Sequence, residues 1–265
     1  MIINAPYIPA FWYSSNNFGD NLTHYLIKKI SNRTPVLVSA EDPCDKVMVT
    51  GSILNNNVVN ATVWGCGLAF STDTVPPKKN ILAVRGKLTG EILKRQGVQF
   101  NEAYGDPALL LPRLYDIEVP KRWKLGILPH YVDTKHVYDK LGMNDMELAV
   151  HGIKILDIMS DVEDVIRQIK SCEKVLSSTL HGLITAHAYG VPCSWAKFTD
   201  NIGGDDFKYL DYYSSIDCEQ NTFIDLRVDN LNINTLRALS TYEGIVAPLL
   251  KIDLNKLWNC CPFRY

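Results

Sequence analysis

Short apolar runs alternate along the chain with stretches whose apolar residues recur at helical spacing. Before residue 112, the runs that favour strands are 35–39, 46–50, 61–64 and 81–84, and helical patterns cover 21–30 and 88–96. The alternation restarts after residue 122, with strands predicted at 124–128, 153–158, 173–177 and 193–196 and helices at 137–141, 162–171 and 183–189. Strands that alternate with helices predict an α/β fold with parallel sheets.

The segment 112–122 carries two prolines and mixed charges, which is typical of a crossover between two lobes. We therefore expect an N-terminal Rossmann-like lobe at 1–118 and a C-terminal Rossmann-like lobe at 119–265, with a helical tail at about 231–257. Two such lobes facing a central cleft would bind ligands at the carboxyl ends of their strands.

Composition narrows the possible ligands. The 265-residue chain has a net charge of -2 and a pI near 6.3, which argues against a broad electrostatic surface for nucleic acid. Its seven cysteines lack the spacing of a zinc site, so no metal is expected. No signal-peptide pattern or membrane-length apolar run is present, which predicts a cytoplasmic protein; peripheral contact with the inner face of the membrane is compatible with this.

The most informative stretch is Ser177 to Gly182, where an apolar strand ends in three hydroxyl side chains and a His-Gly step. The helix predicted to begin near Gly182 would present its N–H groups beside the hydroxyls of Ser178 and Thr179 and the imidazole of His181. Such a group suits a phosphate or a carboxylate. An ordinary helix cap followed by a core histidine is the alternative interpretation.

Arg85 follows the predicted strand 81–84 and precedes a glycine, so its guanidinium should emerge at a strand end. There it could bind a carboxylate or phosphate in bidentate fashion, or serve as a structural ion-pair partner.

Asp106 precedes a proline, which predicts a turn; alternatively it orients Arg85 or a sugar hydroxyl. His130, at the end of the first strand of the second lobe, is either a candidate base or a surface histidine.

Small residues follow two further strands, at Gly51-Ser52 and at Gly65, as happens where a ligand or another backbone comes close. Neither place matches a dinucleotide or Walker motif. The pair Asp205-Asp206 lies on a glycine loop, and a solvated turn is favoured there over a metal site.

Two further groups suggest contacts with a sugar. Asn17 and Asp20 precede the first predicted helix, where they could also simply cap it. Tyr209 and Tyr212 belong to an aromatic run, which either packs in the core or forms a platform for a sugar.

Taken in order, these motifs resemble the polysaccharide pyruvyl transferases, especially the bacterial ketal pyruvate transferases of exopolysaccharide synthesis, such as the xanthan type. Each motif is weak alone, but the ordered set is specific. The resemblance extends from residue 17 to residue 213 and rests on residues 17–20, 51–52, 64–67, 83–86, 104–107, 129–130, 177–182, 188–192 and 207–213.

The resemblance implies a two-lobed fold similar to GT-B glycosyltransferases, phosphoenolpyruvate as donor, no cofactor, and a pair of glycan hydroxyls as acceptor. The acceptor glycan would be a polysaccharide or a lipid-linked oligosaccharide. Residues required in the family match Arg85, Leu180 and His181, and we add His130 as a catalytic candidate. The remaining predicted donor-binding residues are Ser178, Thr179, Gly182, Gly51, Ser52 and Gly65, and the predicted acceptor-binding residues are Asn17, Asp20, Asp106, Tyr209 and Tyr212.

One position departs from the family, because Cys66 stands where related enzymes often carry serine. Two other functions stay open on the sequence alone. One is a nucleotide-sugar-dependent glycosyltransferase of the same architecture, and the other is a glycan-binding protein without catalysis.

Overall fold

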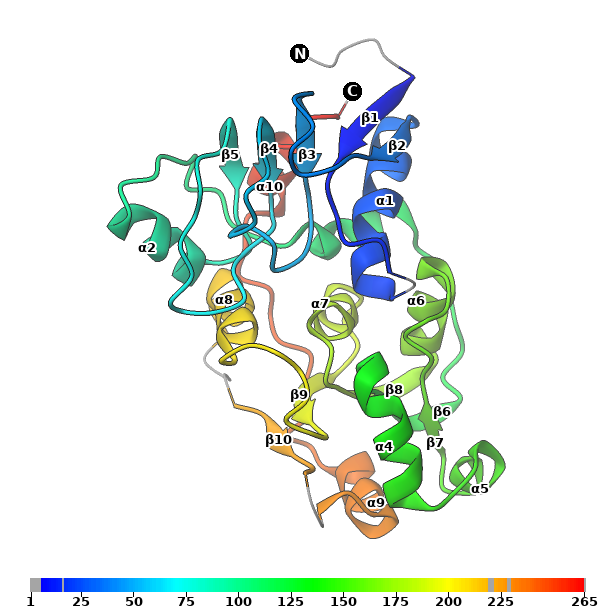
Figure 1. The fold of residues 1–265 in the computed structure, drawn as a ribbon. Coiled ribbons are helices and arrows are strands. Elements are labelled where there is room, and N and C mark those ends of the chain that lie inside the picture. The colour runs from blue at the N-terminus through cyan, green and yellow to red at the C-terminus, as the bar shows by residue number, and fades with distance from the viewer. Residues whose placement is uncertain (1–5, 16, 219–221, 228–229, 265) are drawn as a thin grey trace. The chain divides into compact units, whose positions relative to one another are not determined.

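The structure, a computed structural model, describes residues 6–15, 17–218, 222–227 and 230–264. It contains two compact α/β units (Figure 1). Unit 1 comprises residues 1–114, 204–221 and 250–265, and unit 2 comprises residues 115–203 and 222–249. The predicted α/β class with two Rossmann-like units is confirmed, whereas the GT-B likeness and a cleft between the units stay predictions.

Unit 1 is built on a five-stranded, all-parallel sheet in the order β2-β1-β3-β4-β5. Its strands are β1 (Tyr7–Ala10), β2 (Thr34–Leu37), β3 (Lys46–Met48), β4 (Ala61–Trp64) and β5 (Asn80–Ala83). Its helices are α1 (Phe18–Ser31), α2 (Lys87–Arg95), the 3-10 helix η1 (Pro107–Leu110), α3 (Leu111–Leu114), α8 (Phe207–Ser215) and α10 (Leu254–Asn259).

Unit 2 has a second five-stranded parallel sheet, in the order β10-β9-β8-β6-β7. Its strands are β6 (Trp123–Leu128), β7 (Ile153–Ile155), β8 (Cys172–Ser177), β9 (Cys193–Lys197) and β10 (Ile224–Asp225). Its helices are α4 (Tyr131–Leu141), α5 (Asp145–Val150), α6 (Val162–Lys170), α7 (Leu180–Ala188) and α9 (Ile233–Thr241).

The two sheets share one topology. In each, the first strand of the unit pairs with the second on one side and with the third on the other, and the fourth and fifth follow outward. Strand order therefore reverses between β1 and β3 in unit 1 and between β6 and β8 in unit 2. In open parallel sheets, ligands bind outside the carboxyl ends of the strands at this switch point.

Strand β1, which creates the switch point of unit 1, was missed by the sequence analysis. It is short, and Pro9 lies within it and interrupts the apolar pattern. The side chains of β1 are alternately more and less buried, as in a strand. Pairing with β2 on one side and β3 on the other keeps its backbone extended. Strand β10, of two residues, was also missed.

The chain returns to unit 1 twice after leaving it, which differs from the continuous division at residue 118 expected from the sequence. Helix α8, yellow in Figure 1, packs beside α2. Helix α10 follows later and is tied to β4, because the indole Nε1 of Trp64 donates to the carbonyl of Leu257 at 2.9 Å. The predicted helical tail at about 231–257 contains two separate helices, α9 and α10, which belong to different units.

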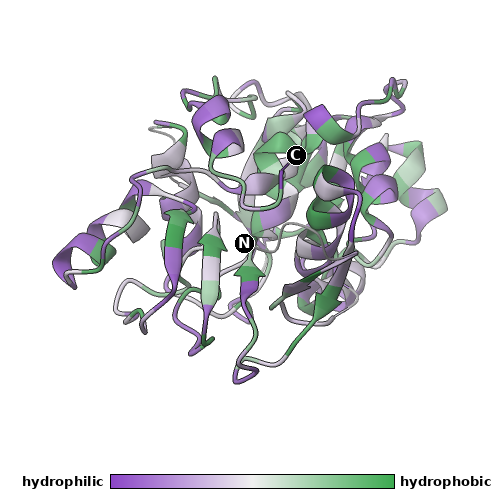
Figure 2. Ribbon diagram, turned by 90° about the horizontal axis from the view of Figure 1, so that it is seen from above, coloured by the Kyte–Doolittle hydropathy of each residue, from purple (hydrophilic) through white to green (hydrophobic). Residues whose placement is uncertain are grey.

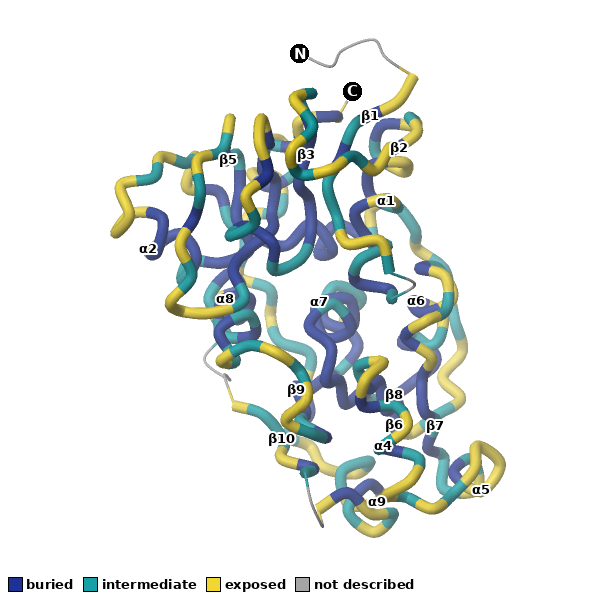
Figure 3. Tube along the Cα trace, in the orientation of Figure 1, coloured by how far each residue is buried: buried dark blue, intermediate teal, exposed yellow. Residues whose placement is uncertain are grey.

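Each unit has its own apolar core beneath amphipathic helices. Buried side chains such as Met48, Leu54 and Val63 form the core of unit 1, and Leu125, Ile127 and Leu176 belong to that of unit 2. The helices carry both hydrophobic and hydrophilic residues (Figure 2). Helix α7 is largely buried (Figure 3), as are β4 and β9. None of the helices in the described part of the chain has the length and apolar character needed to cross a membrane.

We expect Gly86→Ala to destabilise unit 1, because a Cβ at this position would overlap the backbone of Asp211 on α8. Overpacking of this kind costs about 1–3 kcal/mol. Urea unfolding followed by circular dichroism should show the loss. The control is Gly203→Ala, where a Cβ has nothing within 4 Å; equal midpoints for the two variants would contradict the predicted packing of α8.

We expect unit 2 to lose stability in acid because of its buried residue His187. Burial lowers its pKa from 6.5 to about 4, and its Nε2 lies 3.0 Å from the carbonyl oxygen of Cys193. Between these values the unfolded chain binds the proton and the folded chain does not, so this stabilisation is complete above about pH 6.5 and is lost as the pH falls towards 4.

A shift of one pKa unit corresponds to about 1.36 kcal/mol, so the free energy of unfolding should fall by roughly 3 kcal/mol in total. The free energy of urea unfolding, measured at pH 7 and pH 4.5, should fall more for the wild type than for His187→Gln. Equal falls in the two proteins would show that His187 makes no such contribution.

Candidate functional site

Gly51 and Ser52 follow β3 at the switch point of unit 1. Gly51 has a φ of 102°, a left-handed conformation that favours glycine. Just before it, the hydroxyl of Thr50 lies 2.9 Å from that of Thr23 on α1, which joins the loop to the helix that follows β1. The partly exposed Ser52 is thus held on a fixed loop.

Backbone hydrogen bonds join the loops that follow β3, β4 and β5. The N–H of Gly67 donates to the carbonyl of Gly51 at 3.0 Å, and the N–H of Arg85 donates to the carbonyl of Cys66 at 3.3 Å. Gly65 has a φ of 100°, and a Cβ there would overlap the ring of Pro107. Glycine at this position therefore allows η1 to approach the end of β4.

Arg85 is completely buried, and its guanidinium is held by unit 1 through all three nitrogens. Its Nε donates to Asp211 Oδ2 at 2.9 Å, and its Nη2 lies 2.9 Å from the same oxygen. Nη2 also donates to the carbonyl of Leu68 at 2.6 Å, and Nη1 donates to Ser52 Oγ at 2.7 Å. The ion-pair role that the sequence left open for Arg85 is present, and direct contact with a donor stays a prediction.

Asp211 is the centre of this buried cluster. Its carboxylate also accepts from the backbone N–H of Thr89 at 2.8 Å and from the hydroxyl of Thr89 at 2.7 Å. Two glycines make room for the pair: a Cβ on Gly67 would lie 2.7 Å from the Arg85 guanidinium carbon, and one on Gly86 would overlap Asp211. The small residues after β4 and β5 thus accommodate an ion pair.

Burial governs the ionisation of the groups in this part of unit 1. It raises the pKa of Asp211, while the Arg85 charge and the hydrogen bonds from Thr89 oppose that rise. It lowers the pKa of Lys208 on α8 to about 8, and the positive charge of Arg85 acts in the same direction. Burial also raises the pKa of the Cys66 thiol to about 12, so this side chain is neutral at pH 7.

The predicted acceptor-binding residues occupy separate places in unit 1. Asn17 caps α1 by accepting from the N–H of Gly19 at 2.8 Å, and its amide donates to Asp20 at 2.9 Å. Asp106 is buried and extended, and it caps η1 by accepting from the N–H of Ala108 at 2.9 Å. Tyr209 and Tyr212 are buried on α8. These positions account for the capping and packing alternatives, and contact with a sugar stays a prediction.

In unit 2, His130 and Ser178 meet at the switch point between β6 and β8. The backbone N–H of His130 donates to Ser178 Oγ at 2.9 Å, and that hydroxyl donates to Asp133 Oδ2 at 2.8 Å. Asp133 is fully buried in the first turn of α4 and also accepts from the hydroxyl of Thr199, just after β9. One carboxylate therefore ties together the segments that follow β6, β8 and β9.

Helix α7 begins at Leu180, so the predicted start near Gly182 is wrong. Thr179 is the N-cap, and its hydroxyl accepts from the N–H of Gly182 at 2.9 Å. This early start places Leu180 and the partly exposed His181 in the first turn. At Gly182 a Cβ would lie 2.5 Å from Leu128 Cδ2 and 2.7 Å from Ser177 Oγ, so glycine allows the helix to pack closely on β6 and β8.

The sequence analysis missed the residues that hold these groups in place. Asp211 lay within the aromatic run around Tyr209 and Tyr212 and was not singled out, although it is the acidic residue within α8. Asp133 and Thr199 are far from Ser178 in sequence, and nothing in the local pattern of either residue marks it as a partner.

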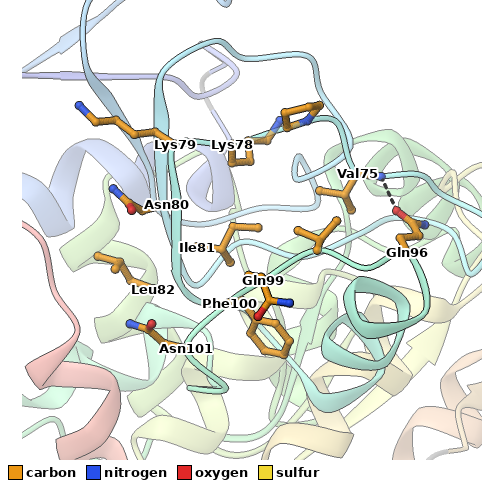
Figure 4. Close-up of a pocket in the computed structure, with 12 residues that line it drawn as sticks. Val75, Lys78, Lys79, Asn80, Ile81, Leu82, Gln96, Gln99, Phe100 and Asn101 are labelled. Carbon is orange, nitrogen blue, oxygen red and sulfur yellow. Dashed lines mark hydrogen bonds between the residues drawn. The ribbon is translucent and has the colours of Figure 1, made fainter.

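A separate cavity in unit 1 lies beside β5, the edge strand of its sheet (Figure 4). Its lining includes Lys78, Asn80, Phe100 and Asn101, and it contains none of the predicted site residues. Within the described ranges, no three His, Cys, Asp or Glu side chains group together in a way that could hold a metal ion. All seven cysteines are free thiols.

The structure thus brings Ser52 together with Arg85 in unit 1, and His130 together with Ser178 in unit 2. Binding of a ligand by either group stays a prediction.

Known proteins are similar to this chain along most of its length. The chain is 29% identical over 239 residues to the uncharacterized protein L143 of Acanthamoeba polyphaga mimivirus, a match that covers 86% of this chain and 81% of that protein. It is 26% identical over 217 residues to the succinoglycan biosynthesis protein ExoV of Rhizobium meliloti (strain 1021), covering 78% of this chain and 64% of ExoV. The latter match supports the predicted closeness to exopolysaccharide enzymes.

The family model described as polysaccharide pyruvyl transferase matches residues 3–195, a range that contains both switch points and both site groups except Asp211 and Thr199. The predicted resemblance is confirmed, and this chain belongs to the polysaccharide pyruvyl transferase family.

Proposed function

We propose that this protein transfers the enolpyruvyl group of phosphoenolpyruvate to two hydroxyls of one sugar, forming a pyruvate ketal and releasing phosphate. The observation that carries the proposal is the position of the candidate residues: Ser52 with Arg85 at the first switch point, and His130 with Ser178 at the second. Open parallel sheets bind ligands at these points. Family membership supplies the class of reaction.

Phosphoenolpyruvate is a small trianion, so its site must supply concentrated positive charge and hydrogen-bond donors. In unit 1, Ser52, which accepts from Arg85, offers a hydrogen-bond donor, and Lys208 adds positive charge. In unit 2, the positive end of the α7 dipole lies at Leu180 and His181. The proposal assigns both groups to the binding of phosphoenolpyruvate.

The proposed reaction has two additions. His181 gives a proton to the methylene carbon of phosphoenolpyruvate, which leaves an oxocarbenium-like centre at C2. One sugar hydroxyl adds to C2 and loses its proton, with His130 or His181 as base. The C2–O bond to phosphate then breaks, and the second hydroxyl adds with loss of its proton. The products are the ketal, with a new methyl group, and hydrogen phosphate.

Leu180 and Gly182 would position His181. Both are buried in the first turn of α7, and Gly182 lets that turn pack closely against β6. The Asp133–Ser178 hydrogen bond would hold His130 beside it. The acceptor, a polysaccharide or a lipid-linked oligosaccharide, would bind near Asn17, Asp20, Asp106, Tyr209 and Tyr212. The proposed setting is the cytoplasm or the inner face of the membrane.

Mass spectrometry tests the reaction directly. Candidate exopolysaccharide repeat units are incubated with the protein and phosphoenolpyruvate, and one product should gain the mass of a single pyruvate ketal with release of one phosphate. Glycosyl transfer from a nucleotide sugar, with no ketal formed, would replace the proposal with the glycosyltransferase alternative. Glycan binding without either product would indicate a binding protein.

We expect His181→Ala to reduce kcat by about 10²- to 10⁴-fold, the usual contribution of general acid–base catalysis. The melting temperature should stay close to that of the wild type. The matched control is His151→Ala, because His151 ends α5 before the amino end of β7, at the opposite edge of the sheet. Turnover at the wild-type rate in the His181 variant would remove this histidine from the chemistry.

A further inference from the structure

The Arg85 guanidinium faces inward, and only its bond to Ser52 leads to a partly exposed side chain. Nε and Nη2 face the Asp211 carboxylate, and Nη2 also faces the Leu68 carbonyl. All of these groups belong to unit 1 and are buried, except Ser52. The charge of Arg85 is therefore best placed to reach a ligand through the serine hydroxyl.

The hydrogen bond to Ser52 fixes the direction in which that hydroxyl can donate. A serine hydroxyl has one proton and two acceptor lone pairs. Ser52 Oγ accepts from Nη1 of Arg85 at 2.7 Å, so its own proton points away from the guanidinium. Among the described residues the structure shows no acceptor for that proton. Accepting from a cation also makes the hydroxyl a stronger donor.

The position of Ser52 after a strand of the sheet favours binding of a ligand through its hydroxyl proton. The residue follows β3, and the β1/β3 boundary is the switch point of unit 1. The left-handed Gly51 before it and the hydrogen bond from Gly67 N–H to the Gly51 carbonyl fix the loop at this edge.

We propose that Asp211, Arg85 and Ser52 form a relay in which Ser52 donates the hydrogen bond to the anionic donor substrate, while Arg85 and Asp211 are positioning residues. Asp211 fixes the plane of the guanidinium, and Arg85 orients and polarises the hydroxyl. This inference rests on the proposed function, because it assigns the residue of unit 1 that touches phosphoenolpyruvate.

Binding of phosphoenolpyruvate, measured by isothermal titration calorimetry on the full chain, tests the relay. Ser52→Ala should weaken binding by about 10-fold or more, since a hydrogen bond to a charged group contributes about 1.5–3 kcal/mol. Ser52→Thr keeps the hydroxyl and should restore binding to within a few-fold of the wild type. This pair of variants leaves the buried ion pair intact.

A double-mutant cycle distinguishes the relay from direct contact by Arg85. Arg85→Lys should weaken binding in the wild-type background but change it less than twofold in the Ser52→Ala background, and Asp211→Asn should behave in the same way. Ser214→Ala is the matched control, because Ser214 lies on the same helix and accepts from the Lys87 N–H at 2.9 Å. It should leave the affinity unchanged.

The outcomes separate the two proposals. Wild-type protein that does not bind phosphoenolpyruvate would overturn the proposed function and the relay with it. Wild-type binding that persists unchanged in Ser52→Ala would overturn the relay alone. Fully additive losses for Ser52→Ala and Arg85→Lys would also overturn it, because they indicate that each side chain contacts the substrate independently. If the Arg85 variant does not fold, the alanine and threonine variants of Ser52 still test the relay.

Discussion

The buried ion pair between Arg85 and Asp211 is the interaction on which the candidate site of unit 1 depends. A buried charge pair is tolerated only when hydrogen bonds satisfy its remaining donors and acceptors, and losing one partner costs about 3–5 kcal/mol. Here Thr89, Leu68 and Ser52 supply those bonds. The carboxyl edge of the sheet is consequently built around a guanidinium that its paired carboxylate holds in one orientation.

This constraint explains features of the chain that otherwise look unrelated. Gly67 and Gly86 leave space for the pair, and α8 must return to unit 1 to bring Asp211 to α2. The result is a discontinuous unit in which residues 126 positions apart complete one cluster. In unit 2, Asp133 performs a comparable task with neutral partners, holding the ends of β6, β8 and β9 together through Ser178 and Thr199.

Both units have the same strand order, and in both the candidate residues lie where that order reverses. Each unit has a single reversal of strand order, and each reversal carries hydroxyl side chains together with a cationic or imidazole group. In the proposed reaction the donor bears a phosphate and a carboxylate, and hydroxyl, cationic and imidazole groups are suited to bind such anions.

The sequence by itself determined the α/β class, most strands to within a few residues, the family, and the candidates Arg85, Ser52, His130 and His181, because these follow from local apolar periodicity and short motifs. Only the tertiary structure decided that β1 is a strand, that α7 starts at Leu180, and that the chain returns to complete unit 1. It also decided the partners: Asp211 for Arg85 and Asp133 for Ser178. Local patterns record which residues favour a helix or a strand, whereas these pairings depend on which distant segments the sheets bring together, and no short stretch of sequence contains that information.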